Sequence, residues 1–217
     1  GGTTIGSLPW FIPHSDETRI QAEPSLLDEF GDNEYYISTK MDGSSHAIGL
    51  DENDEFYVCG HNYRYKDDGK SSFYEFVKKR QFEEQLRFYK DTIDASQIAV
   101  VGEFCAPGIQ RNRLELTAPE WYVFTVEIDG HAVSLETMDA TALTIGAKTV
   151  PIEEKGIKLA EKYPTIESLL VRAEGQYPNG GSKEGIVIRT CEPVYSQTLG
   201  KCLSMKVINN KYLLKNE

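Results

Sequence analysis

The chain has 217 residues, of which 40% are hydrophobic and 26% charged, and this composition predicts one globular unit. Its formal net charge of -11, from 34 acidic and 23 basic residues, excludes a surface that attracts phosphate backbones over its whole area. A nucleic-acid partner would therefore need a local basic patch or a separate module.

Membrane insertion and secretion are not predicted. No apolar run approaches the ~20 residues that span a bilayer, and no apolar N-terminal segment suggests a signal peptide. Cys59, Cys105, Cys191 and Cys202 lack the paired spacing of a zinc site. These features predict an intracellular protein, cytoplasmic or nuclear, with reduced cysteines. We also expect a monomer.

The N-terminal third is predicted to be an arm followed by strands. Residues 1–30 are Pro-rich and weakly periodic, and we expect them to lie as an arm over the domain formed by residues 31–217. Residues 34–40, 45–51 and 55–60 alternate apolar and polar side chains with the period of half-buried strands. They predict an antiparallel meander.

A long amphipathic segment follows. Residues 71–90 place aromatic and aliphatic side chains near helical spacing after two serines that can cap a helix, which predicts a single helix packed on a sheet. The apolar runs at 98–104 and 120–128 predict two buried strands.

The C-terminal half mixes helices and strands. Three helices are predicted, over residues 135–147 with an end near Gly146, 152–163 and 165–176. Strands are predicted at 184–190 and 202–208, after a Gly-rich turn at 178–182. The expected fold class is α+β, with mostly antiparallel sheets and flanking helices.

Charged residues interrupt several of these apolar runs. They are Lys40 and Asp42 after the first strand, Glu103 in "VVGEF", Glu184 in "EGIVIR" and Lys206 in "SMKVI". An unpaired buried charge costs several kcal/mol, so we expect these side chains to face one another, a ligand or metal ions. Taken singly, each is better explained as a solvated strand end, and a Lys40–Asp42 surface pair would contribute only roughly 0.2 to 1 kcal/mol.

The order of these motifs resembles that of the covalent nucleotidyltransferases, which comprise RNA ligases, DNA ligases and mRNA capping enzymes. "KMDGSSHA" is similar to an RNA ligase, because DNA ligases usually carry an arginine soon after KxDG, where this chain has Ser44 and Ser45. "VVGEFCAPGIQRNRL" resembles RNA ligase 2-like enzymes, and "SMKVINNKYLLK" resembles the closing motif of the RNA ligase 5 type. The resemblance extends over residues 5–215.

This resemblance implies an adenylyltransferase domain, of the ATP-grasp-like ligase type, that joins a 3'-OH to a 5'-phosphate through lysyl-AMP. Lys40 would be the nucleophile toward ATP. Asp42, Glu103 and Glu184 would hold Mg2+ or Mn2+ beside the α-phosphate, and Lys206 would assist catalysis. The residues implied in nucleotide binding are Thr39, Lys40, His61, Glu103, Phe124 and Lys206.

Several of these roles have specific grounds. Phe124 lies where the family places a ring against the adenine, although it could be an ordinary core phenylalanine, and Tyr122 shares its face. Main-chain contacts near Thr39 would select adenine. Glu103 is also expected to reach the ribose.

Two positions depart from the family pattern. His61 occupies the place of an expected arginine, with only Arg64 nearby, and a histidine lacks the permanent charge and fork geometry of arginine. Ser204 stands where many relatives have a second lysine before Lys206, so one of two phosphate contacts is expected to be missing, although Lys201 or Lys211 could contribute one.

The expected partner is RNA, as free ends or a nicked duplex. Too few residues follow Lys206 for the C-terminal domains of the relatives, so we expect no OB domain in this chain and RNA binding with help from a separate one. The local basic residues that could contribute are Arg111, Arg113, Lys78, Lys79 and Arg80.

Three alternatives remain open from the sequence. A GTP-using capping-type transferase and a DNA ligase share the same lysine chemistry. A catalytically degenerate nucleotide-binding module would explain the departures at His61 and Ser204. It is disfavoured by the presence of all five motif residues, Lys40, Asp42, Glu103, Glu184 and Lys206.

Overall fold

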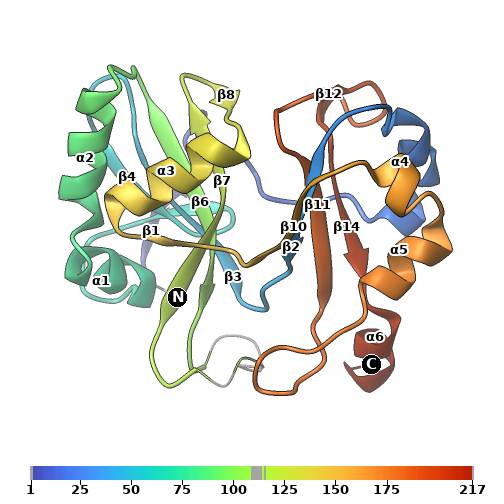
Figure 1. Cartoon of the computed structure of the whole chain (residues 1–217). Helices are drawn as coiled ribbons and strands as arrows, with labels where there is room; N and C mark the ends of the chain where they lie inside the picture. Colours follow the sequence, from blue (N-terminus) through green and yellow to red (C-terminus); the bar gives the residue numbers. More distant parts are fainter. Residues whose placement is uncertain (1, 109–113, 115, 217) are drawn as a thin grey trace. The chain divides into compact units, whose positions relative to one another are not determined.

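In the computed structural model, the chain folds into two compact units (Figure 1). The structure describes residues 2–108, 114 and 116–216. Unit 1 contains residues 2–15, 43–108 and 116–149, and unit 2 contains residues 16–42, 114 and 150–216.

Unit 1 is built on an eight-stranded sheet with the order β1-β5-β4-β3-β6-β7-β8, in which β9 also pairs with β7. All neighbours are antiparallel except β7 and β9. The strands are β1 (Thr4–Ser7), β3 (Ser44–Leu50), β4 (Phe56–Cys59), β5 (Tyr63–Tyr65), β6 (Ile98–Cys105), β7 (Glu120–Ile128), β8 (His131–Ala132) and β9 (Lys148–Thr149).

Three helices, α1 (Ser72–Lys79), α2 (Phe82–Thr92) and α3 (Leu135–Ile145), complete unit 1. Phe73 of α1 and Phe82 of α2 both pack on Trp121 of β7, each with ring centroids 5.5 Å apart. Trp121 is fully buried, and its indole N–H donates to His46 O at 3.2 Å. This aromatic layer fixes one face of the sheet against the helices.

The opposite face of the unit 1 sheet has a smaller apolar cluster. Phe11 and Ile12 pack there on Ala47, Cys59, Ala99 and Val101, and Phe124 lies partly buried against the same cluster. Glu103 pairs in register with Ser45, two residues from the Ala47–Val101 pair, so alternation places Glu103 on this face.

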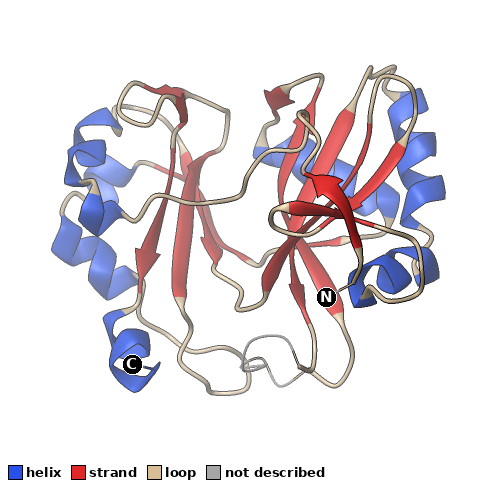
Figure 2. Ribbon diagram, turned by 180° about the vertical axis from the view of Figure 1, so that it is seen from behind, coloured by secondary structure: helices blue, strands red, loops and turns tan. Residues whose placement is uncertain are grey.

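Unit 2 is built on a four-stranded antiparallel sheet with the order β10-β2-β11-β14 and a short β12-β13 hairpin. The strands are β2 (Tyr35–Thr39), β10 (Ile152–Ile157), β11 (Gly185–Thr190), β12 (Tyr195–Ser196), β13 (Lys201–Cys202) and β14 (Ser204–Ile208). Its helices are η1 (Ile20–Ala22), η2 (Pro24–Glu29), α4 (Leu159–Lys162), α5 (Ile166–Arg172) and α6 (Asn210–Asn216). Figure 2 shows helices beside the strands of each unit.

The two faces of the unit 2 sheet differ in character. Ile37, Ile188 and Met205 are fully buried and lie in one register row, in a core shared with Leu26 and Leu169 from the helices. Ser38, Val187 and Lys206 form the neighbouring row and therefore face away from this core.

The predicted α+β class with mostly antiparallel sheets and flanking helices is confirmed. Of the individual elements, the helix ending at Gly146 is confirmed, and Gly146 adopts the left-handed conformation with φ 81° at the C-terminus of α3. In the described part of the chain, no helix has the length and apolar character needed to cross a membrane.

Three element predictions are wrong. β2 does not join β3 and β4 in a meander, because it pairs with β10 and β11 while the chain passes from unit 2 to unit 1 after Asp42. The single helix over 71–90 is two helices, separated by Gln81 in the left-handed conformation with φ 58°. Residues 152–163 form strand β10 and the short α4, with Gly156 at φ 70°.

Candidate active site

Lys40 lies one residue beyond β2, beside the start of β11. Its main-chain N–H donates to Gly185 O at 3.0 Å, and its Nζ lies 3.3 Å from Glu184 Oε1. Both side chains are about four-fifths buried, with exposures of 22% and 20%. Antiparallel pairing of β2 with β11 therefore brings these two predicted residues together, because the end of one strand meets the start of the other.

The ion pair has a chemical consequence for Lys40. A carboxylate beside an amine favours the protonated form of the amine, whereas nucleophilic attack requires a neutral amine. An amine at this position would therefore have to lose a proton before it could attack an electrophile.

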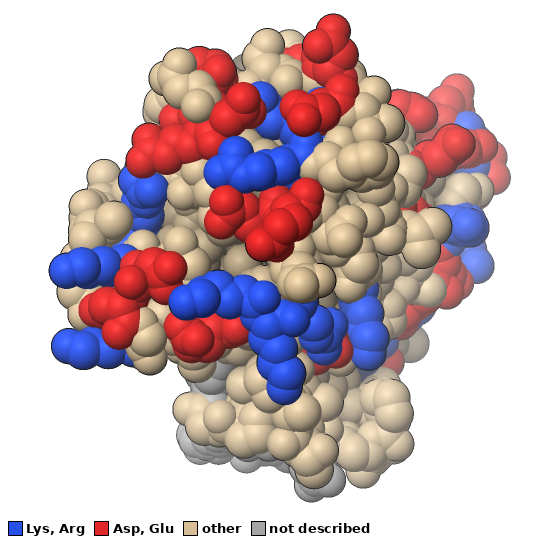
Figure 3. All heavy atoms as spheres, turned by 90° about the vertical axis from the view of Figure 1, so that its left-hand side faces the viewer, with Lys and Arg blue, Asp and Glu red and all other residues tan. Residues whose placement is uncertain are grey.

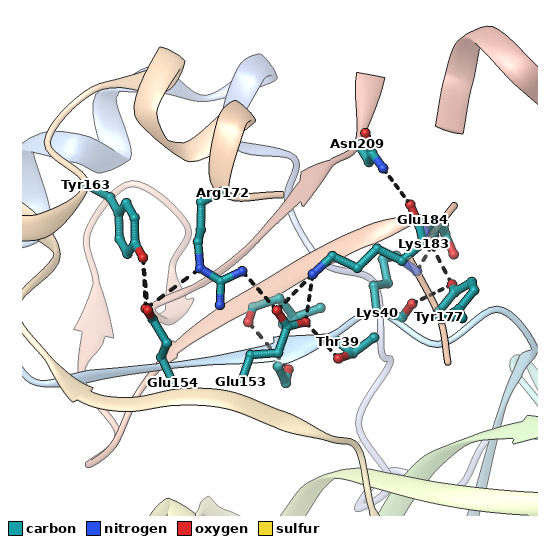
Figure 4. A network of polar contacts seen from close by, with 12 residues as sticks. Thr39, Lys40, Glu153, Glu154, Tyr163, Arg172, Tyr177, Lys183, Glu184 and Asn209 are labelled. Atoms are coloured by element: carbon teal, nitrogen blue, oxygen red, sulfur yellow. Dashed lines mark hydrogen bonds and ion pairs between the residues drawn. The ribbon is translucent and has the colours of Figure 1, made fainter. Parts of the chain in front are cut away.

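Two buried residues hold the main chain around this pair (Figure 4). The Tyr177 hydroxyl donates to Lys40 O at 3.0 Å and accepts from the Glu184 N–H at 3.2 Å. The fully buried Asn209 donates its N–H to Glu184 O at 2.9 Å and its Nδ2 to Lys183 O at 3.0 Å. Neither residue was assigned a role from the sequence, although Asn209 belongs to the "NNKYLLK" motif.

Glu153 of β10 is the centre of a charged network next to Lys40 (Figure 4). It accepts hydrogen bonds from Lys183 Nζ at 2.8 Å, Arg172 Nη1 at 2.9 Å and Thr39 Oγ1 at 2.7 Å. Burial alone would raise the pKa of Glu153, but the hydrogen bonds from Lys183, Thr39 and Arg172 hold this pKa below its ordinary value. The side chain of Thr39, predicted near the nucleotide, is thus bonded within this network.

Lys206 of β14 lies on the sheet face that points away from the unit 2 core, in register with Val187 and Ser38. Its N–H donates to Thr18 O at 2.8 Å, and Arg19 forms a parallel bridge with it. Bridged residues project to the same face, so the two cations are neighbours. Arg19 Nε is buried and has no hydrogen-bond partner among the described residues. Arg19 was missed because its segment shows no strand periodicity.

Ser204 has a structural partner. It lies opposite Arg189 in the β11–β14 ladder, its hydroxyl donates to Glu17, and Arg189 forms an ion pair with the same carboxylate. Burial would raise the pKa of Glu17, but Arg189 and Ser204 together lower it. The position of the second lysine in many relatives is therefore occupied by part of a buried polar cluster.

The other cations considered for phosphate contact are already engaged. Lys211 Nζ lies 3.2 Å from Glu174 Oε2, and Lys201 Nζ donates to Asp16 O at 3.2 Å. Arg19 is accordingly the better candidate to accompany Lys206.

In unit 1, the glycines of two motifs are required by packing. A Cβ on Gly102, just before Glu103, would lie 2.6 Å from Trp121 Nε1 and from Tyr122 O. A Cβ on Gly43 would lie 2.4 Å from Phe104 O. The glycine of KxDG and that of "GEF" thus permit close approach of neighbouring strands.

Glu103, Phe124 and His61 all belong to unit 1. Glu103 pairs in register with Tyr122, and Phe124 is partly buried on the apolar cluster of the same sheet face. His61 is exposed in the turn between β4 and β5. Arg64, the nearby arginine, lies 4.0 Å over the Tyr57 ring and 3.2 Å from Glu55, so its charge is already partnered.

The model of the RNA ligase family matches residues 33–208. The chain belongs to the RNA ligase family. No curated protein sequence matches this RNA ligase family member.

Solved structures of RNA ligases share its fold. A Naegleria gruberi RNA ligase mutant without ligand matches with a TM-score of 0.85 and 24% identity, over 100% of this chain and 61% of that one. A mutant of this ligase with ATP and Mn matches with the same score and identity, over 100% and 62%. Another mutant of the Naegleria gruberi ligase, also without ligand, matches with a TM-score of 0.83 and 25% identity, over 99% of this chain and 61% of that one. This RNA ligase family chain thus spans less than two thirds of the length of those ligases.

The predicted metal ligands belong to different units. Asp42, which is buried, and Glu184 lie in unit 2, and Glu103 lies in unit 1. Within the residues that the structure describes, no three His, Cys, Asp or Glu side chains form a group that could hold a metal ion. A joint metal site in this RNA ligase family member remains a prediction.

The predicted basic surface is mixed in charge. Lys78 Nζ lies 3.1 Å from Asp67 Oδ1 and Arg80 Nη2 lies 3.1 Å from Glu120 Oε2. Figure 3 shows, on the face that it presents, Lys and Arg side chains interleaved with Asp and Glu. Of the other three predicted basic residues, Lys79 is exposed, and Arg111 and Arg113 lie outside the described residues.

Proposed function

We propose that the chain is the nucleotidyltransferase core of an ATP-dependent RNA ligase, with Lys40 as the nucleophile. The observation that carries this proposal is the position of Lys40 at the end of β2, 3.3 Å from Glu184, in a member of the RNA ligase family. Similar Naegleria gruberi RNA ligase structures contain ATP and Mn, AMP and Mn, or PPi, which supports ATP as the nucleotide.

The proposed reaction has three steps. Lys40 Nζ, after losing a proton, attacks the α-phosphorus of ATP, so that an N–P bond forms and the P–O bond to pyrophosphate breaks. The AMP then passes to the 5'-phosphate of an RNA strand, which releases the lysine. A 3'-OH finally attacks that phosphate, forming the phosphodiester and expelling AMP.

Lys206 and Arg19 are proposed to neutralise the phosphates during the first step. Phosphoryl transfer depends mainly on positioning and on stabilising the charge of the transferred group. Both residues lie on the sheet face that points away from the core of unit 2, which leaves them available to an anion. Thr39, His61, Glu103 and Phe124 remain the proposed contacts to the nucleoside.

Asp42, Glu103 and Glu184 are the proposed ligands of Mg2+ or Mn2+. Carboxylate oxygens are the donors that such hard cations prefer, and the cation would supply further neutralisation of the phosphate charge. Glu184 is held beside Lys40 by its own main-chain bonds to Tyr177 and Asn209, so its carboxylate stays close to the nucleophile.

The test of this function is the intact mass of the protein after incubation with ATP and Mg2+ or Mn2+. The wild-type chain should gain one AMP, and Lys40→Ala should gain none while keeping its circular dichroism spectrum. An adduct that persists in Lys40→Ala, or that maps to another residue, would contradict the assignment.

Two further arms of this experiment separate the alternatives. Labelling by GTP in preference to ATP would indicate a capping-type transferase. Sealing of nicks with a DNA 3' end in preference to an RNA 3' end would indicate a DNA ligase. Nucleotide binding without any adduct would indicate a degenerate binding module.

A further inference from the structure

Tyr177 lies in the segment between α5 and β11, and its side chain is 3% exposed. Its hydroxyl donates to Lys40 O and accepts from the Glu184 N–H, at 3.0 and 3.2 Å (Figure 4). A phenol carries one donor and acceptor lone pairs. One oxygen therefore bonds to the main chains of both residues.

These two main-chain groups lie beyond the strand ladder. The register of β2 with β11 ends at Thr39 and Ile186, and the Lys40 N–H bond to Gly185 O extends it by one step. The Lys40 carbonyl and the Glu184 N–H come after that step. Tyr177 therefore provides the link that the sheet itself does not.

The segment that carries Tyr177 is itself held in place. The Tyr177 N–H donates to Gly181 O at 2.7 Å, and the Gly180 N–H donates to Tyr177 O at 2.8 Å. The Lys183 N–H donates to Gly175 O at 3.1 Å, and Lys183 Nζ bonds to both Glu153 oxygens. These bonds fix the segment that carries the Tyr177 ring. Burial raises the pKa of Tyr177, which keeps its proton on the oxygen at neutral pH.

We infer that Tyr177 is a positioning residue of the lysine chemistry, whose hydroxyl fixes the main chain of Lys40 relative to that of Glu184. This inference rests on the proposed function. Its buried hydroxyl bonds to the main chains of these two residues, so Tyr177 acts through them. Its loss should therefore slow the transfer to Lys40 while leaving ATP affinity largely intact, because small displacements of a nucleophile reduce rates strongly.

The test compares Tyr177→Phe with Tyr35→Phe, which removes one buried hydroxyl from the same unit. The Tyr35 hydroxyl donates to Phe30 O at 2.8 Å, and its side chain is fully buried. Tyr177→Phe should lower the single-turnover rate of Lys40–AMP formation about tenfold or more, with KM for ATP within about twofold of wild type. Tyr35→Phe should keep that rate within about twofold of wild type. Its loss of Tm, measured by calorimetry, should be similar to that of Tyr177→Phe.

A second readout does not depend on activity. Amide hydrogen exchange of the peptide that contains Glu184 should be faster in Tyr177→Phe than in wild type and unchanged in Tyr35→Phe, because the Glu184 N–H loses its acceptor. If the wild type forms no adduct, the proposed function fails, and the exchange still decides whether Tyr177 fixes the Glu184 main chain. Unchanged exchange, a wild-type transfer rate in Tyr177→Phe, or an equal rate loss in Tyr35→Phe would overturn the inference.

Discussion

Arg19 and Ser204 are both close to Lys206, but only Arg19 can offer a charge to a phosphate. Ser204 donates to Glu17 inside a buried cluster, whereas Arg19 bridges Lys206 directly. A guanidinium presents a planar fork that matches phosphate oxygens. The structure thus supplies a candidate for the second cation at a position distant in sequence from the family motif.

Replacing Arg19 tests this role at the residue scale. Arg19→Ala should lower the rate of Lys40–AMP formation by about a hundredfold, because the loss of one donor to a developing charge has effects of at least this order. The measurement is single-turnover adenylylation over a range of ATP concentrations. Lys201→Ala, which removes an exposed cation bonded to Asp16 O, is the matched control and should stay within about twofold of wild type. Equal losses in both variants would show that Arg19 has no particular place in phosphate binding.

At this scale, a residue could be predicted from the sequence when its charge differed from the apolar residues around it. Lys40 and Glu184 could be singled out because charges interrupt β-rich runs, and the structure brings them together. Tyr177 lies beside a Gly-rich turn, where a tyrosine carries no such contrast. Its role becomes visible only when its hydroxyl is seen between two main chains that are far apart in sequence.

At the scale of elements, the wrong predictions concern segments whose structure depends on contacts with residues distant in the sequence. The segment 152–163 has apolar residues at spacings compatible with a helix, yet residues Ile152–Ile157 pair with β2 as an edge strand. Helical periodicity does not reveal the break at Gln81, because apolar rings continue on both sides of it. Phe76 before the break and Phe82 after it pack against each other, with ring centroids 5.8 Å apart. By contrast, the helix ending at Gly146 was predictable because its stop signal is local.

Glu153 links β10 to three other parts of unit 2, and this gives an expectation for pH. Its pKa is lowered in the folded state, so its ionisation contributes stability above its ordinary pKa of 4.5, and this contribution is lost as pH falls through the lowered value. Glu153→Gln cannot make this contribution and leaves Lys183 and Arg172 without their shared carboxylate. At pH 7 it should be less stable than wild type by about 2 kcal/mol.

The measurement is the free energy of unfolding by urea at several pH values between 7 and 3.5. The difference between wild type and Glu153→Gln should shrink below pH 4.5. Glu161→Gln, on the exposed surface of α4, is the control and should follow the wild type throughout. A difference that stays constant with pH would show that Glu153 stabilises the unit by packing alone.

At the scale of the whole molecule, family and fold class were predictable because the motifs occur in order along the chain, and the family match at 33–208 confirms them. The charges of the chain, by contrast, do not favour a high affinity for RNA. The net charge is -11, and the basic side chains Lys78 and Arg80 are paired with carboxylates. Cations that are already paired contribute less to a phosphate backbone than free ones do.

Salt should therefore separate the steps of the proposed reaction. Between low and moderate salt, sealing of a nicked RNA duplex with a pre-adenylylated strand should fall steeply, because each neutralised phosphate releases counterions. Formation of Lys40–AMP, which needs only a small ligand, should change little. The two rates are measured on the same preparation, alone and with an OB domain joined at the N-terminus, which should increase sealing only. Equal salt responses of both rates would contradict a weak RNA affinity of this core.

The burial of Trp121 has a practical consequence for spectroscopy. The only other tryptophan, Trp10, is 74% exposed, and both belong to unit 1. Indole emission shifts to longer wavelength when water reaches the ring, so a fluorescence melting curve excited at tryptophan reports the opening of unit 1. Unit 2, which contains Lys40, can lose its structure without a signal of its own in that experiment. Variants such as Tyr177→Phe and Glu153→Gln should consequently be followed by tyrosine absorbance or calorimetry.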